Sequence, residues 1–116
     1  MRWDVEYTDE FEVWWRSLDE ATQEDLAVSV GLLEAYGPNL GHPHSSGVRG
    51  SKFAHMRELR TQSGGAPLRT LYAFDPRRVA ILLIGGDKTG KDDWYAHFVP
   101  IADKIYAKHL QEIGKE

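Results

Sequence analysis

The chain contains no cysteine, which excludes disulfide bonds and thiolate metal sites. It also lacks a long hydrophobic run: the longest, residues 79–84, is the length of a strand, far short of the roughly 18 apolar residues that span a bilayer. The first residues contain no apolar signal region, so we expect a cytoplasmic protein that does not associate with membranes. Four Trp, five Tyr and four Phe argue against disorder, and 116 residues fit one domain, 1–116, around one modest core.

The net charge of −4 is unevenly distributed along the chain. Residues 1–37 carry two basic and ten acidic side chains, whereas residues 49–91 carry nine basic and three acidic side chains. Because salt screens surface charges beyond roughly 8–10 Å, a local positive field can attract phosphate even on an acidic protein. The segment 49–91 therefore predicts a surface that binds RNA phosphate. The alternative is a solvated strand surface that the acidic helices neutralise.

The N-terminal part predicts one strand and two helices. Apolar side chains at every second position indicate a half-buried strand over residues 2–7. Thr8 and Asp9 offer an N-cap for a first helix, and the capping-box spacing of Ser17 and Glu20 predicts that a second helix begins near Ser17. A glycine followed by proline ends that helix at residues 36–38.

The rest of the chain predicts a sheet closed by a helix. After a loop at 39–50, strand-like patterns cover 55–62, 67–75 and 78–85, and a helix covers 92–111. The order β-α-α-β-β-β-α implies a small antiparallel α+β domain. The expected buried stripe of the last helix consists of Trp94, Phe98, Ile101, Ile105 and His109.

The middle hairpin places charged residues opposite one another. If Gly64 and Gly65 form a two-residue turn, Arg60 lies directly across from Arg69, and Glu58 lies on the same face, diagonal to Arg69. Two opposed guanidinium groups repel each other unless an anion separates them. That anion is either Glu58, which gives the pair a structural role, or a bound phosphate. A register slip of one residue would move one arginine to the other face.

Other groups on the chain suggest further chemistries. The loop 85–91 approaches the P-loop pattern of a nucleotide-binding enzyme, but Asp92 replaces the hydroxyl that would hold magnesium. No two histidines have the helical spacing of a metal site, so no metal is expected. Tyr95 and His97, at the start of the last helix, are candidates for stacking on a base or for proton transfer. The alternative is that Tyr95 packs beside Trp94.

The order and spacing of these motifs resemble the RelE/HigB superfamily of bacterial toxins, more specifically its phage-derived HigB branch. Two departures stand out: Asp87 lies where the family commonly has a positive charge, and the loop 39–50 has no clear counterpart. The matching segments are Met56-Arg57-Glu58-Leu59-Arg60, Leu68-Arg69-Thr70-Leu71-Tyr72-Ala73-Phe74, residues 79–86, Lys88-Thr89-Gly90-Lys91 and the closing amphipathic helix.

The resemblance implies a RelE-like fold and an endoribonuclease without metal or cofactor, which cuts mRNA, typically on the ribosome, through attack of the 2′-OH on the phosphate. It also implies a cognate helix-turn-helix antitoxin, through which alone the complex would contact operator DNA. Arginine offers paired donors to phosphate oxygens. The candidate catalytic residues are Arg60, Arg69, Lys88, Lys91, Glu58 and Tyr95, and the candidate RNA-binding residues are Arg57, Arg49, Lys52 and His97.

Within this set the individual roles stay open. Glu58 is either the base or a group that orients the arginines, and Lys88 and Lys91 supply charge or a proton. The competing class is a non-catalytic RNA- or protein-binding module that uses the same basic sheet. A third class is an enzyme with a phosphate ligand on the loop 85–91.

Overall fold

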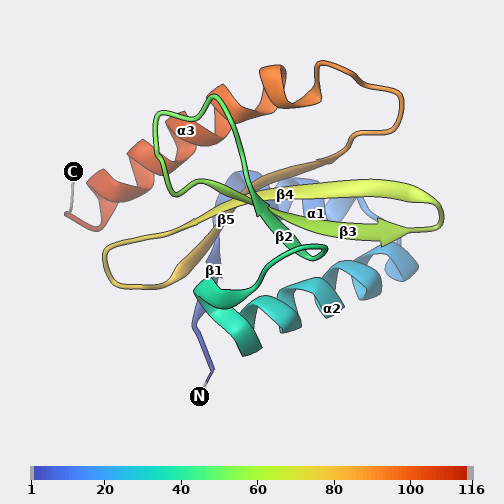
Figure 1. Ribbon diagram of the computed structural model, residues 1–116, viewed down its shortest axis with the longest axis horizontal. Helices are drawn as coiled ribbons and strands as arrows, with labels where there is room; N and C mark the ends of the chain where they lie inside the picture. The colour runs from blue at the N-terminus through green and yellow to red at the C-terminus, as the bar shows by residue number, and fades with distance from the viewer. Residues whose placement is uncertain (1, 115–116) are drawn as a thin grey trace.

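The computed structural model describes residues 2–114, in which a five-stranded sheet lies between α3 on one face and α1 and α2 on the other (Figure 1). The α+β class is therefore confirmed. The elements are β1 (Val5–Tyr7), α1 (Asp9–Ser17), α2 (Glu20–Tyr36), a 3-10 turn (Gly37–Asn39), β2 (Ser45–Gly47), β3 (Arg57–Ser63), β4 (Ala66–Phe74), β5 (Ala80–Asp87) and α3 (Trp94–Glu112).

The strand order is β1-β5-β4-β3-β2, and it corrects two expectations. The strands β2 to β5 pair in antiparallel fashion, but β1 runs parallel to β5 at the edge of the sheet. The expectation of a purely antiparallel sheet was therefore wrong for β1. The strand β2 was missed because its sequence, Ser-Ser-Gly, has little strand propensity of its own. It forms because Ser45 to Gly47 find partners on the edge of β3.

The two N-terminal helices begin at side-chain caps. The Thr8 hydroxyl accepts a hydrogen bond from the Phe11 amide at 3.1 Å, so Thr8 caps α1 as predicted. The prediction that α2 begins near Ser17 was wrong, because the Ser17 hydroxyl donates to the Trp14 carbonyl at 2.6 Å in the last turn of α1. Asp19 caps α2 instead and accepts from the Thr22 amide at 2.8 Å.

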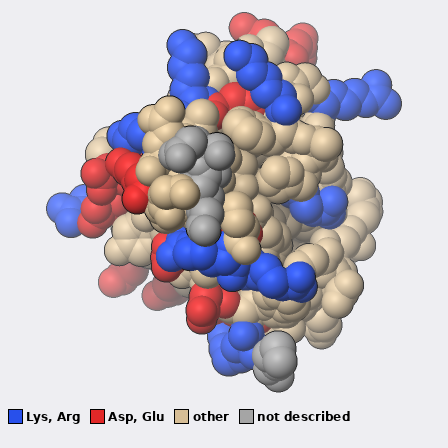
Figure 2. Space-filling model, turned by 90° about the vertical axis from the view of Figure 1, so that its left-hand side faces the viewer, with Lys and Arg blue, Asp and Glu red and all other residues tan. Residues whose placement is uncertain are grey.

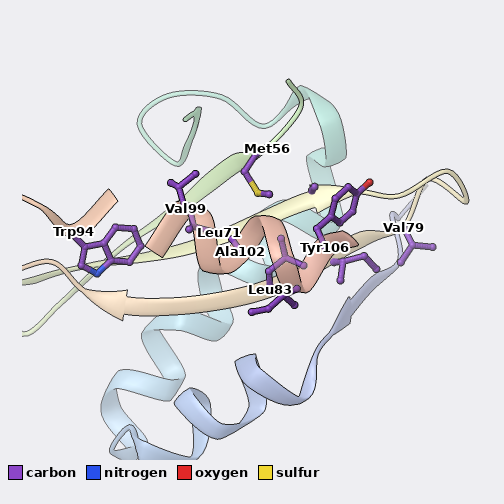
Figure 3. Close-up of a cluster of buried hydrophobic side chains, with 11 residues drawn as sticks. Met56, Leu71, Val79, Leu83, Trp94, Val99, Ala102 and Tyr106 are labelled. Atoms are coloured by element: carbon purple, nitrogen blue, oxygen red, sulfur yellow. The ribbon is translucent and has the colours of Figure 1, made fainter. Parts of the chain in front are cut away.

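The face of the sheet under α3 holds one hydrophobic cluster (Figure 3). Trp94, Val99, Ala102 and Tyr106 of α3 point toward the sheet, where they meet side chains such as Leu71. Of the stripe expected on this helix, Trp94 and Ile105 are buried, whereas Phe98, Ile101 and His109 are only half-buried. The helix is therefore rotated slightly from the expected orientation, with Val99 and Ala102 facing the sheet.

The opposite face packs against α1 and α2. Phe11, Leu26 and Leu33 of the helices meet Leu59 and Leu82 of the sheet. Among residues 2–114, no helix is long and apolar enough to cross a membrane.

Candidate functional site

The hairpin of β3 and β4 has the predicted register. Gly64 and Gly65 form its turn with φ values of 56° and 84°, and Arg60 pairs with Arg69. Because side chains two residues apart in a strand share a face, Glu58 lies on the same face as Arg60. This is the face that α3 covers, so the start of α3 approaches the charged residues.

Glu58 is the centre of this charged group. It is only 6% exposed, yet its carboxylate has three polar neighbours from three other elements or loops. The Tyr95 hydroxyl donates to Oε1 at 2.5 Å, and the Ser46 hydroxyl donates to Oε2 at 2.7 Å. The Arg69 Nε atom lies 3.4 Å from Oε1. A buried carboxylate needs such compensation, since burial without it disfavours the charged form.

Arg69 is also only 6% exposed. Its Nη1 donates to the Leu68 carbonyl at 2.9 Å, but its Nε has no hydrogen-bond partner within residues 2–114. Across the strand pair lies Gly86, where an added Cβ would come within 3.0 Å of the Trp94 Nε1. The guanidinium is thus held in place by packing and by its ion pair with Glu58, which the buried Nε atom faces.

Arg60 avoids the repulsion expected from Arg69 by a contact with the loop before β2. Its Nη1 lies 2.9 Å from the Nε2 of His42, a residue of the loop that precedes β2. Because a guanidinium group can only donate, the imidazole nitrogen is the acceptor in this contact. Glu58 therefore pairs with Arg69 alone, while Arg60 is drawn toward the loop.

Tyr95 joins α3 to the charged group. Burial raises the pKa of its hydroxyl, the bond to Glu58 raises it further, and the neighbouring Arg69 acts in the opposite direction. The Tyr95 ring also packs edge-on against Trp94, with centroids 5.1 Å apart, which is the packing that the alternative predicted. The Lys88 Nζ lies 5.4 Å from the ring centroid, a cation–π contact that places a positive charge over the Tyr95 ring.

The remaining candidate residues lie outside this group. Arg57 points to the other face of the sheet, where its Nε donates to the Ser45 hydroxyl at 3.1 Å. Lys91 is exposed in the loop before α3, and Arg49 and Lys52 are exposed in the loop before β3. His97 is exposed on α3, two residues beyond Tyr95 and hence on a different side of the helix. The structure brings together Glu58, Arg60, Arg69, Lys88 and Tyr95, and does not bring Arg57 to them.

The basic segment 49–91 is thus divided between two ends of the molecule. Figure 2 shows the end where α3 finishes and the β4–β5 turn lies, with basic and acidic side chains interspersed. There the Arg77 Nη2 pairs with Asp75 at 2.8 Å and with Glu6 at 2.9 Å. Those charges neutralise one another, so only part of the segment is available near Glu58.

The geometry supports neither a nucleotide-binding loop at residues 85–91 nor a metal site built from histidines. Gly85 and Gly86 lie inside β5, so they do not form a loop that could wrap around a phosphate. His55 bonds to the Tyr106 hydroxyl at 3.0 Å and His109 to Asp75 at 2.9 Å, in separate surroundings. No group of three potential metal ligands occurs within the described part of the chain.

Two members of the site were missed. Ser46 lies on β2, a strand without a sequence pattern, and reaches Glu58 only because β2 pairs with β3. His42, which contacts Arg60, was not among the candidate site residues. The cluster of histidine, proline and serine in the loop 39–50 is a weak signal, since such residues are also typical of solvated loops.

Comparisons with known proteins identify the family. The model of the family described as "Phage derived protein Gp49-like" matches residues 13–107. The chain belongs to this family. Within the RelE/HigB toxins it is similar to the candidate toxins HigB3 and HigB2 of Mycobacterium tuberculosis. The identity to HigB3 is 44% over 94 residues, 80% of this chain and 81% of HigB3.

The identity to HigB2 is 42% over 101 residues, which cover 85% of this chain but 50% of HigB2, so the chain spans half the length of that relative.

Solved structures place this Gp49-like chain in the RelE fold. A mutant of Escherichia coli RelE in the free state matches with a TM-score of 0.57 at 13% identity, over 97% of this chain and 99% of that one. Pyrococcus horikoshii RelE, solved with RelB, matches with a TM-score of 0.56 at 18% identity, over 78% of this chain and 99% of that one.

Proposed function

We propose that this chain is the toxin of a type II toxin–antitoxin system, and that it is an endoribonuclease which cleaves mRNA in the cytoplasm, on the ribosome. The observation that carries the proposal is the buried Glu58, which joins the Tyr95 hydroxyl to Arg69 beside a second arginine, Arg60. Such a group supplies both charge for a phosphate and a route for a proton. The similarity to the HigB3 toxin of Mycobacterium tuberculosis supports the toxin role.

In the proposed reaction, Arg69 and Arg60 bind the phosphate to be cut. Guanidinium groups match the phosphate oxygens with paired donors, and the phosphate relieves the repulsion between the two arginines. The extra negative charge of the phosphorane strengthens these bonds, so the arginines stabilise the transition state more than the ground state.

The 2′-oxygen then attacks phosphorus, the bond from phosphorus to the 5′-oxygen breaks, and the products are a 2′,3′-cyclic phosphate and a 5′-OH. Before the reaction, the Tyr95 hydroxyl donates a hydrogen bond to Glu58 and accepts one from the 2′-OH. As the 2′-OH loses its proton to Tyr95, Tyr95 passes its own to Glu58, so the phenol never becomes a free phenolate. The raised pKa of Tyr95 favours this coupled transfer.

Lys88, beside the Tyr95 ring, donates a proton to the leaving 5′-oxygen, with Lys91 adding positive charge from the same loop. Arg49, Lys52 and His97 are exposed and provide a general attraction for RNA. Arg57, which is bonded to Ser45, supports β2 and contributes to RNA binding indirectly. A cognate helix-turn-helix antitoxin binds the toxin, and operator DNA is contacted only through it. The RelE of Pyrococcus horikoshii is likewise held by a partner, RelB.

The test is inducible expression in bacteria, with and without the neighbouring reading frame, followed by mapping of mRNA 5′ ends. We expect growth inhibition and new 5′-OH ends that the neighbouring gene suppresses and that persist for the purified protein in EDTA. Arg60→Ala, Arg69→Ala and Lys91→Ala, each checked for folding by circular dichroism, should lose cleavage. If cleavage and toxicity persist in all three, the assigned site is wrong.

The second candidate function is a non-catalytic RNA- or protein-binding module. The observation that favours it is that both carboxylate oxygens of Glu58 are already hydrogen-bonded, as in a purely structural site. It predicts RNA binding with a steep salt dependence, without cleavage products and without toxicity. The same expression experiment separates the two functions.

A further inference from the structure

A pocket of about 560 Å³ opens next to the charged group. One wall is α2, with Val28 and Leu32, and the other is the loop before β2, with His42 and Pro43. Arg60 and Arg69 line it as well, whereas Glu58 and Tyr95 do not. The pocket and the proposed catalytic group therefore share the two arginines and lie on either side of them.

The floor of the pocket is an unpaired stretch of the edge of β3. The pairing of β2 with β3 covers only residues 57–59, and one further bond runs from the Arg60 amide to the His44 carbonyl at 2.9 Å. Backbone groups two residues apart in a strand point to the same edge. The N–H and C=O of Gln62 therefore point into the space beyond the end of β2, where they can bond to another molecule.

The polar side chains around this floor are arranged to leave it open. The Asp25 carboxylate is held by the Ser63 hydroxyl at 2.7 Å, and the Ser29 hydroxyl accepts from Thr61 at 2.7 Å. Arg60 is drawn to the outer wall by His42. The result is a pocket whose walls combine the apolar side chains of Val28, Leu32 and Pro43 with polar ones. It has one exposed donor and acceptor pair at its floor and two cations at its border.

We propose that this pocket binds the base of a nucleotide next to the phosphate that is cut, and that the backbone of Gln62 reads its hydrogen-bonding edge. Val28, Leu32 and Pro43 contact the base faces, and Arg60 and Arg69 hold the adjoining phosphate. A flat, polar-edged ring on a phosphate chain fits both these three apolar side chains and the cationic border. This inference rests on the proposed function, because it assumes that the chain's ligand is RNA.

The test uses a single-stranded RNA oligonucleotide in which each 2′-OH is replaced by hydrogen, so that it binds without being cut. Binding to the full chain is measured by fluorescence anisotropy, for the intact strand and for a set of strands with one abasic position each. The variant Val28→Trp fills the pocket. The control is Val13→Trp, because Val13 is 72% exposed on α1, Val28 is 67% exposed on α2, and only Val28 lines the pocket.

With the unchanged protein, we expect one abasic position to weaken binding about tenfold or more, the order of one stacked base. Val28→Trp should weaken binding of the intact strand by a similar factor and should abolish the further effect of that abasic position. Val13→Trp should leave both unchanged. The proposal is overturned if abasic positions affect Val28→Trp as they affect the unchanged protein, or if none of them affects either.

The outcomes also separate this inference from the proposed function. If a cleavable RNA is not cut, but the abasic effect is present and lost in Val28→Trp, the pocket is a base-binding site and the catalytic role fails. If RNA is cut but the choice of cleavage site is the same in Val28→Trp and Val13→Trp, the reaction stands and the base site is wrong.

Discussion

At the scale of single residues, the site depends on a buried carboxylate whose position is fixed from several sides. Glu58 receives hydrogen bonds from Tyr95 and Ser46 and an ion pair from Arg69. Removing one partner of a buried charge leaves the others uncompensated, so Arg69→Ala should affect stability as well as function. A residue that contributes only a hydroxyl is the sharper probe of chemistry.

Tyr95→Phe removes the hydroxyl and keeps the ring packed against Trp94. If Tyr95 carries the proton, RNA cleavage should fall by about 10²- to 10⁴-fold, the usual contribution of a general acid or base. The control is Tyr106→Phe, which also removes a hydroxyl with hydrogen bonds, to the Phe74 carbonyl and with the His55 ring. Single-turnover rates on a defined RNA should show a loss in Tyr95→Phe alone; equal rates in both variants would remove Tyr95 from the mechanism.

At the scale of elements, helices pack closely against both faces of the sheet, and two glycines of β5 allow this close packing. At Gly85 in β5, the ring of Trp14 from α1 occupies the space that a side chain would need. On the other face, Gly86 makes room for Trp94 at the start of α3. The pair of glycines that resembled a phosphate loop in the sequence thus serves close packing of two helices on one strand.

Gly85→Ala should therefore destabilise the fold by roughly 1–3 kcal/mol or more, because the new methyl group displaces Trp14. Gly31→Ala in α2 is the matched control, since an added Cβ there meets nothing within 4 Å. That change should be neutral or stabilising by up to about 1 kcal/mol, because alanine favours the helix. Urea unfolding of the two variants measures the difference, and similar stabilities would contradict the close packing.

At the scale of the whole molecule, the end remote from the site is closed by a network around Asp75. Its buried carboxylate accepts from the Arg77 and Val79 amides, from the Arg77 guanidinium and from His109 of α3. Arg77 in turn reaches Glu6 of β1. The network ties the β4–β5 turn to the last helix and to the first strand, which fixes α3 over the sheet.

Burial acts to raise the pKa of Asp75, but the bonds from His109, Arg77 and the backbone outweigh it and lower this pKa. The stability that Asp75 contributes is then fully present above the unfolded pKa of about 3.9 and is lost as the pH falls through the lower folded value. Asp75→Asn should lower the free energy of unfolding by roughly 2–5 kcal/mol at pH 7.

The difference between Asp75→Asn and the unchanged protein should narrow as the pH falls below about 4, where the unchanged protein loses the contribution of the carboxylate. Denaturant unfolding between pH 7 and pH 2 measures this. Asp87→Asn is the control, because Asp87 is exposed and its bonds to Thr89 are local. A difference that stays constant over this range would show that Asp75 acts through shape and not through charge.

Local sequence patterns were sufficient to predict the β3–β4 hairpin and the type of most helices and strands. The two glycines of the β3–β4 turn determined the register, and the register placed Arg60 opposite Arg69 and Glu58 beside them. The Thr8 cap and the glycine end of α2 were likewise correct, because such signals act within a few residues. The start of α2 was misassigned because Ser17 and Asp19 both look like N-caps. Ser17 bonds to Trp14, and Asp19 caps α2.

The sequence by itself determined the class of fold, the paired arginines and the likeness to the HigB toxins, because these depend on neighbours in the chain. Only the tertiary structure decided that β1 lies parallel to β5, that Arg60 turns to His42, and that Ser46 and Tyr95 share Glu58. The physical reason is distance along the chain. Ser46 and Tyr95 lie 12 and 37 residues from Glu58, and no local pattern encodes a contact that forms only when β2 pairs with β3 and α3 packs over the sheet.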